Sequence, residues 1–524
     1  MGDMKQTEKL KRIRQTLSEV PEVSSYYPVA DALKRATELK EQAIEKALQA
    51  FLSMPQSTTV FANPVQHDAV VSCNGIDITL NIRSFTIRGL VNESEIVAGK
   101  HSPAYVIFVG LFGRVPQKDD NLDEEAMLCA LIDRKFYRAG RVVREDIGGR
   151  KRLIDQVAEF VKTFPGNGPE ITIQHMSALR KAHKAKTGTA SRGINNTRPK
   201  ARILLEMIQT HMENVAIAAI SVHMNHLLRE DDRLTPPQLV NETWCFLEHE
   251  EKAGKTAFQA CYSCLLGHHA NDVENEILER LGLIQTHHGS AGSNIVARYM
   301  ATLHTRTISD FFSAPHMILD GFRHFGAIHD MTEFVNHLEC KTPAERDAII
   351  KQRMLGGSLP TFGHPEIAAA GRADHIQQDP RPALYLDPLF RALDRGKITL
   401  TPKQKEQLAI VQRIYQLAFV EGVIKPGREK EPPLRLTPNT DFGGWSVQQA
   451  LGIDDCDRTI LTYVFRGFGW MMDGREQMTQ QVIRPVVPAD PQIIPKPDGD
   501  TTIPDVVVSM HQRLVSGNAF AQKR

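Results

Sequence analysis

The sequence predicts a mainly α fold with a small β element near residues 68–90, and three patterns support this prediction. Residues 29–54 carry apolar side chains at helical spacing among strong helix formers. Residues 69–82, AVVSCNGIDITLNI, alternate around Asn74-Gly75, a dipeptide typical of a tight hairpin turn. From Ser102 to Thr305 the chain reads as successive helices separated by short turns. We therefore expect helices to build nearly all of the core.

The remaining segments follow in chain order. FTIRGL, residues 85–90, predicts a further strand after the hairpin. The basic run at residues 180–192 fits a solvated loop, and a phosphate contact is the alternative. Residues 425–440 are rich in proline and charge and resemble a connector, and the chain after Pro485 resembles an extended arm.

Composition excludes several classes of protein. The 63 basic and 62 acidic side chains give a net charge of +1, which argues against a nucleic-acid binder. No apolar run reaches the roughly 18 residues of a membrane span, and the charged N-terminus lacks a secretory signal. Seven scattered cysteines indicate reduced thiols and a cytoplasmic location. Cys261-x-x-Cys264 has no second pair at zinc spacing, so we expect no metal site.

Four polar clusters interrupt the helical pattern. They are Thr286–Ser290, Gly321–Gly326, the stretch from Leu359 to Pro382 and Pro438–Asp441, followed by Arg466 and Arg484. Together they supply imidazoles that exchange protons near neutral pH, one carboxylate, and guanidinium groups that match carboxylate oxygens. This combination suits proton abstraction beside a carbonyl with an anionic co-substrate. Taken alone, each histidine fits a core or surface position better than a catalytic one, because the spacing does not show that the groups meet.

The order of these clusters resembles the citrate synthase family over about residues 68–486. GFRHFGAIH at 321–329 is similar to the family's Gly-Pro-hydrophobic-His-Gly-Gly-Ala-Asn-Glu, and TFGHPEI followed by DPRP is similar to Gly-Phe-Gly-His followed by Asp-Pro-Arg-Ala. PNTDF, THH, RGFGW followed by EQ, and VIRP are similar to the family's Pro-Asn-Val-Asp-Phe, Ala-Asp-His, Arg-x-x-Gly-Trp followed by Glu-Gln, and Ile-x-Arg-Pro.

The resemblance implies a role for each matching residue. His324, His364 and Asp441 are implied as catalytic groups, with Asp441 as the base. The implied oxaloacetate ligands are His288 (or, one register earlier, His287), Arg381, Arg466 and Arg484. Arg484 would come from the partner subunit of a homodimer.

The resemblance also implies an activity and an architecture. The activity is that of an acyl-CoA:oxaloacetate C-acyltransferase, which makes citrate and free CoA from acetyl-CoA and needs a coenzyme A thioester as co-substrate but no tightly bound cofactor. The architecture is a citrate-synthase-like two-domain helical subunit. We expect an N-terminal helical extension at 1–62, a large domain at 63–335 plus 446–524, and a small domain at 336–445.

The chain departs from the family pattern where coenzyme A would bind. Phe325 replaces a glycine, Ile328-His329 replaces Asn-Glu, and Pro365-Glu366-Ile367 follows His364 in place of Arg-Val-Tyr. Two alternatives therefore stay open. One is a 2-methylcitrate or alkylcitrate synthase that uses a longer acyl-CoA, and the other is a non-catalytic protein that keeps the fold for binding.

Overall fold

The structure is a computed structural model that describes part of the chain. The described residues are 70–74, 77–82, 85–86, 103–112, 116, 118, 123–141, 152–166, 171–179, 194, 200–286, 292–305, 307–319, 326–356, 359–363, 381–417, 424–425, 434–435 and 438–478. The predictions for residues 29–54, the basic run at 180–192 and the chain after Pro485 lie outside these residues.

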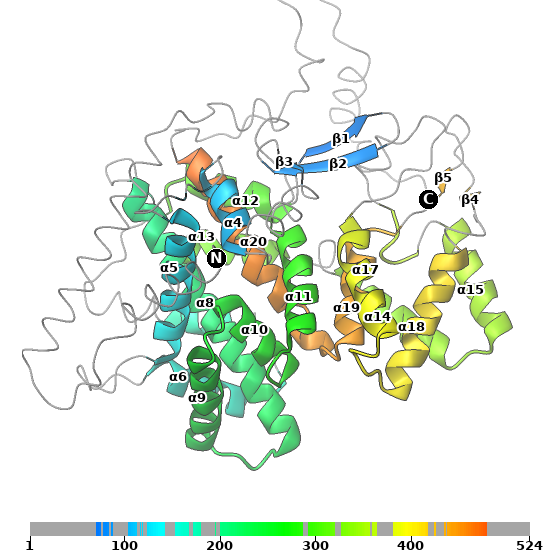
Figure 1. Cartoon of the computed structure of the whole chain (residues 1–524), viewed down its shortest axis with the longest axis horizontal. Coiled ribbons are helices and arrows are strands. Elements are labelled where there is room, and N and C mark those ends of the chain that lie inside the picture. The colour runs from blue at the N-terminus through cyan, green and yellow to red at the C-terminus, as the bar shows by residue number, and fades with distance from the viewer. Residues whose placement is uncertain are drawn as a thin grey trace, which may run out of the picture.

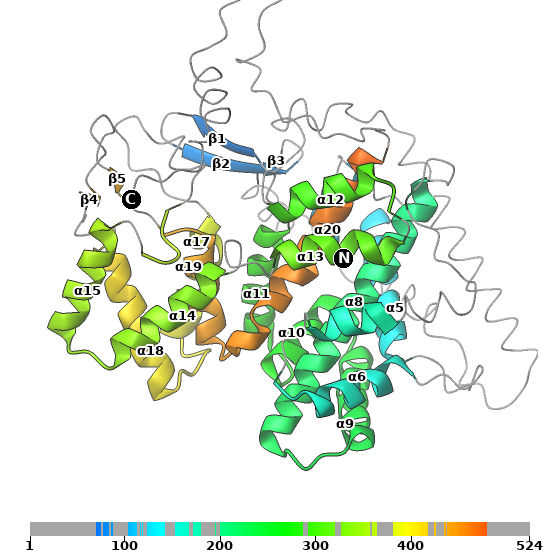
Figure 2. The same ribbon diagram turned by 180° about the vertical axis from the view of Figure 1, so that it is seen from behind.

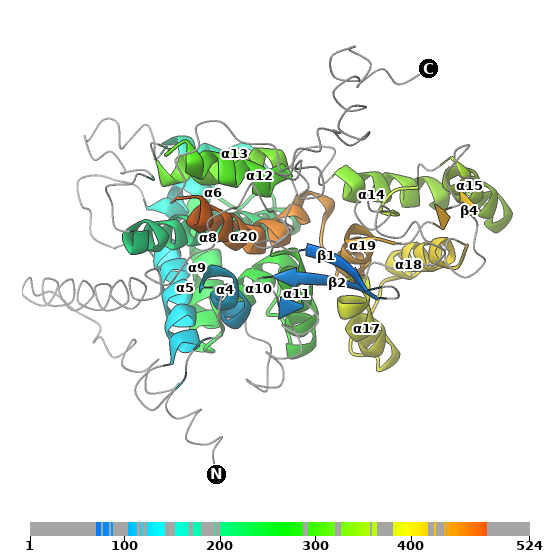
Figure 3. The same cartoon turned by 90° about the horizontal axis from the view of Figure 1, so that it is seen from above.

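The small β element is confirmed. Strands β1 (Val70–Asn74) and β2 (Asp77–Ile82) pair antiparallel, and their register sets Asn74 opposite Asp77 at the predicted turn. Strand β3 (Phe85–Thr86) pairs with β2 and completes a three-stranded sheet at one edge of the molecule (Figures 1 and 3).

Helices form the rest of the described fold, as predicted, in two groups (Figures 1 and 2). The first group consists of α4 (Pro103–Phe112), α5 (Glu124–Arg141), α6 (Leu153–Thr163), α8 (Lys200–Glu230), α9 (Pro236–Lys252), α10 (Ala257–Leu266), α11 (Asp272–Gln285), α12 (Gly292–Thr302), α13 (Ile308–Leu319) and α20 (Thr459–Gln477). The second consists of α14 (Gly326–Glu339), α15 (Pro343–Leu355), α17 (Arg381–Asp394), α18 (Pro402–Tyr415) and α19 (Thr440–Ala450), with the short strands β4 (Ile424–Lys425) and β5 (Leu434–Arg435). The expected domain division stays a prediction, and its boundaries at 335/336 and 445/446 fall within α14 and α19.

Helix α20 lies at the centre of the first group, in contact with α4, α8, α11, α12 and α13. Its side chains Val464, Phe465 and Phe468 are fully buried. Gly467 allows α8 to approach closely, because a Cβ at this position would collide with the ring of His211. Cys261 and Cys264 are buried in the same core, where burial raises the pKa of the Cys261 thiol to about 12 and holds the pKa of the Cys264 thiol well above its usual value. Both thiols therefore act as apolar packing groups.

The chain crosses from the second group to the first at residues 451–458, between α19 and α20. Asp457, the last residue of the 3₁₀ turn η3 (Asp455–Asp457), forms an ion pair of 2.9 Å with Arg229 of α8. The next residue, Arg458, donates hydrogen bonds of 3.0 Å to Thr332 of α14 and 2.6 Å to Gln449 of α19. Consecutive residues are thus attached to opposite groups of helices.

Two short strands form part of the connection between α18 and α19. The segment predicted as a connector, residues 425–440, begins in β4 and contains β5, and these two strands pair antiparallel and were not predicted. Among the described helices, none combines the length and the apolar character that a membrane span requires.

Three histidines are buried without charge and make the fold sensitive to acid. Burial lowers the pKa of His211, His223 and His316 from 6.5 to about 4. In the unfolded chain these histidines take up protons near pH 6.5, whereas in the folded chain they do so only near pH 4. The stability that they contribute is therefore fully present above pH 6.5 and is lost as the pH falls toward 4. We expect each of these histidines to lower the free energy of unfolding by about 2 kcal/mol between pH 7.5 and pH 5.0. Melting temperatures across this range would measure the loss.

The matched variant is His316→Phe, which keeps an aromatic ring beside Tyr463, 4.3 Å away between ring centroids, and cannot titrate. Its melting temperature should fall by about a third less on acidification, because one of three groups is removed. An unchanged pH dependence in this variant would contradict the assignment.

Candidate functional site

The structure describes the side chains of two predicted site residues, Asp441 and Arg466. Arg381 is placed as the first residue of α17, but its side chain is not described. His288, its register alternative His287, and the three residues His324, His364 and Arg484 lie outside the described residues. The described neighbours of these residues show which segments meet.

Asp441 lies in the first turn of α19, which Asn439 caps. The Asn439 side-chain oxygen accepts hydrogen bonds from the main-chain N–H groups of Asp441 (2.9 Å) and Phe442 (3.3 Å). An asparagine before a helix is a strong N-cap because it satisfies N–H groups that have no partner within the helix. The cap therefore fixes the backbone that carries the Asp441 carboxylate.

The same asparagine reaches the segment that leads to His364. Its main-chain N–H donates to the carbonyl of Thr361 at 3.0 Å, and its side-chain amide donates to the carbonyl of Gly363 at 3.2 Å. Phe362 and Pro438 pair as an antiparallel bridge between these contacts. The residue immediately before His364 thus lies against the turn that carries Asp441, as a shared site requires.

The turn before His364 has an unusual backbone. Thr361 has φ 60° and Gly363 has φ 83°, so both lie in the left-handed region. Glycine adopts this region freely, whereas for a β-branched residue it costs about 1–2 kcal/mol. Thr361 is buried, and its hydroxyl lies 3.7 Å from the sulfur of Met331 in α14. Helix α14, which begins two residues after His324, therefore also contacts this turn.

Helix α17 brings Arg381 toward the same place. The hydroxyl of Tyr385, one helical turn after Arg381, donates a hydrogen bond of 2.7 Å to the carbonyl of Thr440, the residue before Asp441. The ring of Tyr385 occupies the space where a side chain at Gly443 would lie, which lets α17 and α19 pack closely.

Arg466 is buried in α20 and joins three helices of the first group. Its Nε donates to the carbonyl of Gln285 at 2.7 Å, and a terminal nitrogen donates to the Asn294 side-chain oxygen at 3.2 Å. The Asn294 amide then donates to Asp473 at 2.6 Å, and Asp473 forms a buried ion pair of 2.5 Å with Arg298. Because Gln285 ends α11, Arg466 fixes the chain directly before the segment of His287 and His288.

Gln285 connects this network with the helix of Asp441. Its side-chain oxygen accepts a hydrogen bond from Thr462, and its amide lies next to Gly444 of α19, where an added Cβ would be 3.5 Å away. The structure therefore brings Asp441 and Arg466 into one region, between the ends of α11, α17 and α19 and the middle of α20 (Figure 1).

Sequence reasoning missed the polar residues that support Arg466, namely Asn294, Arg298 and Asp473. One signal was available: Arg466 and Asp473 are seven residues apart, so they share a face of α20. Nothing in the spacing shows that α12 provides the partners of both. The linking role of Asn439 was also missed, because its contacts to Thr361 and Gly363 cross more than 70 positions of the chain.

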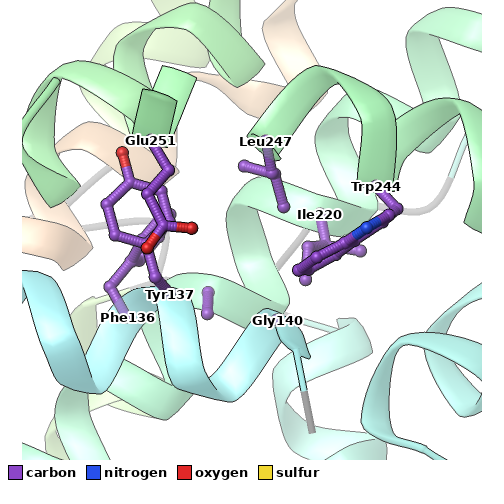
Figure 4. A pocket seen from close by; sticks show the side chains of 8 residues that line it. Phe136, Tyr137, Gly140, Ile220, Trp244, Leu247 and Glu251 are labelled. Carbon is purple, nitrogen blue, oxygen red and sulfur yellow. The ribbon is translucent and has the colours of Figure 1, made fainter. Parts of the chain in front are cut away.

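Two recesses elsewhere in the described structure are separate from this region. One lies between α5, α8 and α9 and is lined by Tyr137, Trp244, Leu247 and Glu251 among others, but it leaves no room for a water molecule (Figure 4). The other, of about 340 Å³, lies between α15 and α18 beside the ion pair of Arg413 and Asp347. Within the described residues, no three histidine, cysteine, aspartate or glutamate side chains meet as a metal site would need.

The buried pair of Arg298 and Asp473 should contribute strongly to stability. Asp473→Asn keeps the shape of the side chain but leaves the Arg298 guanidinium buried without its counter-charge, so we expect a loss of about 3 kcal/mol in the free energy of unfolding. Urea denaturation would measure it. Glu248→Gln is the control, since its ion pair with Lys252 is exposed and should contribute under about 0.5 kcal/mol. Equal losses in the two variants would contradict the interpretation.

Solved structures with the same fold are citrate synthases. The ternary complex of carboxymethyl coenzyme A and oxaloacetate with citrate synthase from the archaeon Thermoplasma acidophilum matches with a TM-score of 0.53 and 14% identity, covering 80% of this chain and 92% of that one. Citrate synthase from Pyrobaculum aerophilum matches with a TM-score of 0.52 and 17% identity over 82% and 91% of the two chains. The enzyme from Thermotoga maritima gives 0.50 and 13% over 82% and 94%. At these identities, the likeness shows the fold.

Sequence comparison identifies the family directly. No curated protein sequence matches the chain. The family described as "Citrate synthase, C-terminal domain" matches residues 70–486, which is most of the chain and includes all of the predicted site residues. The chain therefore belongs to the citrate synthase family.

Proposed function

We propose that the protein condenses an acyl-CoA with oxaloacetate, and that acetyl-CoA is the donor, so that citrate and free CoA are the products. The observation that carries this proposal is the contact of Asn439 with Gly363, which holds the segments of His364 and Asp441 together. Family membership and a fold shared with a complex of carboxymethyl coenzyme A and oxaloacetate support it. The coenzyme A thioester is a co-substrate, and no tightly bound cofactor takes part. The proposed location is the cytoplasm.

Two groups transfer protons in this proposal, and a third stabilises the developing charge. The Asp441 carboxylate removes a proton from the carbon beside the thioester carbonyl, while neutral His324 donates a hydrogen bond to the oxygen on which charge develops. The carbanion attacks the ketone carbon of oxaloacetate, and His364 gives a proton to the new alkoxide. Water then hydrolyses the thioester, which releases CoA and makes the sequence effectively irreversible.

The arginines bind the carboxylates of oxaloacetate. A guanidinium presents two parallel N–H groups to a carboxylate, and a buried guanidinium does so without competition from water. Arg466 is buried, and hydrogen bonds to Gln285 and Asn294 fix its orientation. Arg381 at the start of α17 and Arg484 are the other proposed carboxylate ligands, and His288 lies beside the ketone.

The partner in this proposal is a second copy of the chain. In the described part of the chain, five of ten exposed large hydrophobic side chains lie on the α12–α13 hairpin: Ile295, Tyr299, Leu303, Met317 and Ile318. Ile295, Tyr299 and Leu303, in α12 and directly after it, are four residues apart and form one apolar stripe. Arg298, the single charged residue of α12, is buried behind this stripe. An uncharged apolar stripe packs well against its own copy across a two-fold axis.

The position of α20 supports a shared active site. Asp473, near the end of α20, contacts Asn294 and Arg298 of α12. The chain beyond Met478 therefore leaves the described fold beside the hairpin, and Arg484 is six residues further on. We propose that Arg484 crosses the interface and binds the oxaloacetate of the partner subunit.

The activity is tested by free thiol release. We expect release from acetyl-CoA only when oxaloacetate is present, and Asp441→Asn should lower kcat at least a hundredfold because it removes the base. Asp272→Asn is the control, since Asp272 has a similar place in the first turn of α11 but lies away from the site. No oxaloacetate-dependent release with any acyl-CoA would overturn the proposal.

The same assay separates the alternatives. A higher kcat/KM with propionyl-CoA or a longer acyl-CoA would favour a 2-methylcitrate or alkylcitrate synthase, a choice that the unusual residues Phe325 and Pro365 keep open. Calorimetry that detects tight binding of oxaloacetate and CoA without turnover would favour a non-catalytic binding protein.

The interface is tested by placing a charge on the apolar stripe. Tyr299→Glu should shift the protein from dimer to monomer in light scattering and remove turnover, because burying an unpaired charge is unfavourable and Arg484 would no longer reach a partner. Leu355→Glu is the matched control, as Leu355 is about equally exposed on α15, away from the stripe. A monomer with full activity would refute the shared site.

A further inference from the structure

We infer that Asn439 is a positioning residue of the proposed reaction, which fixes His364 relative to Asp441. The inference rests on the proposed function and deepens it. Asn439 does not touch substrate in this account. It acts through its hydrogen bonds to Gly363, which precedes His364, and to the start of α19, which carries Asp441.

Asn439 directs its side-chain oxygen, its side-chain amide and its main-chain N–H toward these two segments. Its side-chain oxygen accepts from the N–H groups at the start of α19, and its side-chain amide donates to Gly363. Its main-chain N–H donates to Thr361. One planar amide thus links the backbone that precedes His364 to the backbone that carries Asp441. The separation of the two segments is fixed by the length of one side chain.

The turn before His364 needs such a restraint. Thr361 is held in the left-handed region although it is β-branched, a conformation that surrounding contacts must maintain. Both carbonyl groups of the turn that bind Asn439 belong to left-handed residues, Thr361 and Gly363. Without these hydrogen bonds the turn is free to relax, and His364 follows directly after it.

The two roles of Asn439 are separable because capping uses its oxygen and the link to Gly363 uses its amide nitrogen. Aspartate caps helices as well as asparagine does, so Asn439→Asp keeps the start of α19. It cannot donate to the Gly363 carbonyl, and it sets a carboxylate oxygen against that oxygen instead. The variant therefore removes the positioning contact and retains the cap.

The experiment compares Asn439→Asp with Asn271→Asp. Asn271 caps α11 in the same way, accepting from Val273 at 2.9 Å and Glu274 at 3.0 Å, but makes no contact with the turn at Thr361–Gly363. We expect Asn271→Asp to melt within about 2 °C of the parent protein, since it keeps its cap, and Asn439→Asp to melt lower because it also loses the hydrogen bond to Gly363; kcat is therefore compared well below both melting temperatures. Only Asn439→Asp should lower kcat, by about tenfold or more, with the KM for oxaloacetate within threefold because the arginines are untouched.

A second variant separates positioning from the added charge, because Asn439→Asp also introduces a negative charge two residues from Asp441. Asn439→Ser adds no charge, and serine caps a helix but is too short to reach Gly363, so this variant also serves if Asn439→Asp does not fold. It should show the same loss of kcat.

The outcomes are distinct. An active parent protein with an equally active Asn439→Asp variant, or a loss of kcat that matches Asn271→Asp, overturns the positioning role and leaves the proposed function standing. A parent protein without oxaloacetate-dependent turnover overturns the proposed function, and the positioning role with it. A selective loss of kcat in both Asn439→Asp and Asn439→Ser supports the inference.

Discussion

The fold depends on a helix that is buried on several sides and still carries charge. Helix α20 packs against five other helices, and its apolar side chains fill the middle of the first group. A charged side chain in such a helix is tolerated only when its partners are buried with it. Arg466 and Asp473 meet this condition through α11 and α12, so the requirement that stabilises the core also fixes the guanidinium that we assign to substrate binding.

The proposed chemistry is divided between the two groups of helices. Helix α14, which follows His324, the turn that precedes His364 and the start of α19 with Asp441 meet around Thr361 in the second group, whereas Arg466 and the end of α11 belong to the first. Gln285 lies between them, since its carbonyl accepts from Arg466 and its amide lies next to Gly444. The proton-transfer groups and the carboxylate-binding groups can thus change their separation if the two groups of helices move. This arrangement suits an enzyme that closes over its first substrate before it activates the second.

The sequence predicts much of the fold and two of the described site residues, for physical reasons that can be named. The helices and the Asn74-Gly75 hairpin follow from local periodicity and turn chemistry, which depend on neighbouring residues. Asp441 and Arg466 were predicted as site residues because ordered motifs surround them. The contact of Asn439 with Thr361 and Gly363, and the partners of Arg466 on α12, depend on which distant segments pack together. No local pattern encodes that choice, and the two-residue strands β4 and β5 are too short to give a period.

The attachment of Asp457 and Arg458 to opposite groups of helices has a mechanical consequence. The peptide unit between them is held by contacts to both groups of helices, so it is poorly placed to rotate when the groups move relative to each other. We expect a rotation of one group against the other to change backbone angles in the preceding loop instead, where Gly452 already has φ 73°. That loop is where a change of sequence would alter how the two groups of helices move relative to each other while leaving the contacts of Asp457 and Arg458 intact.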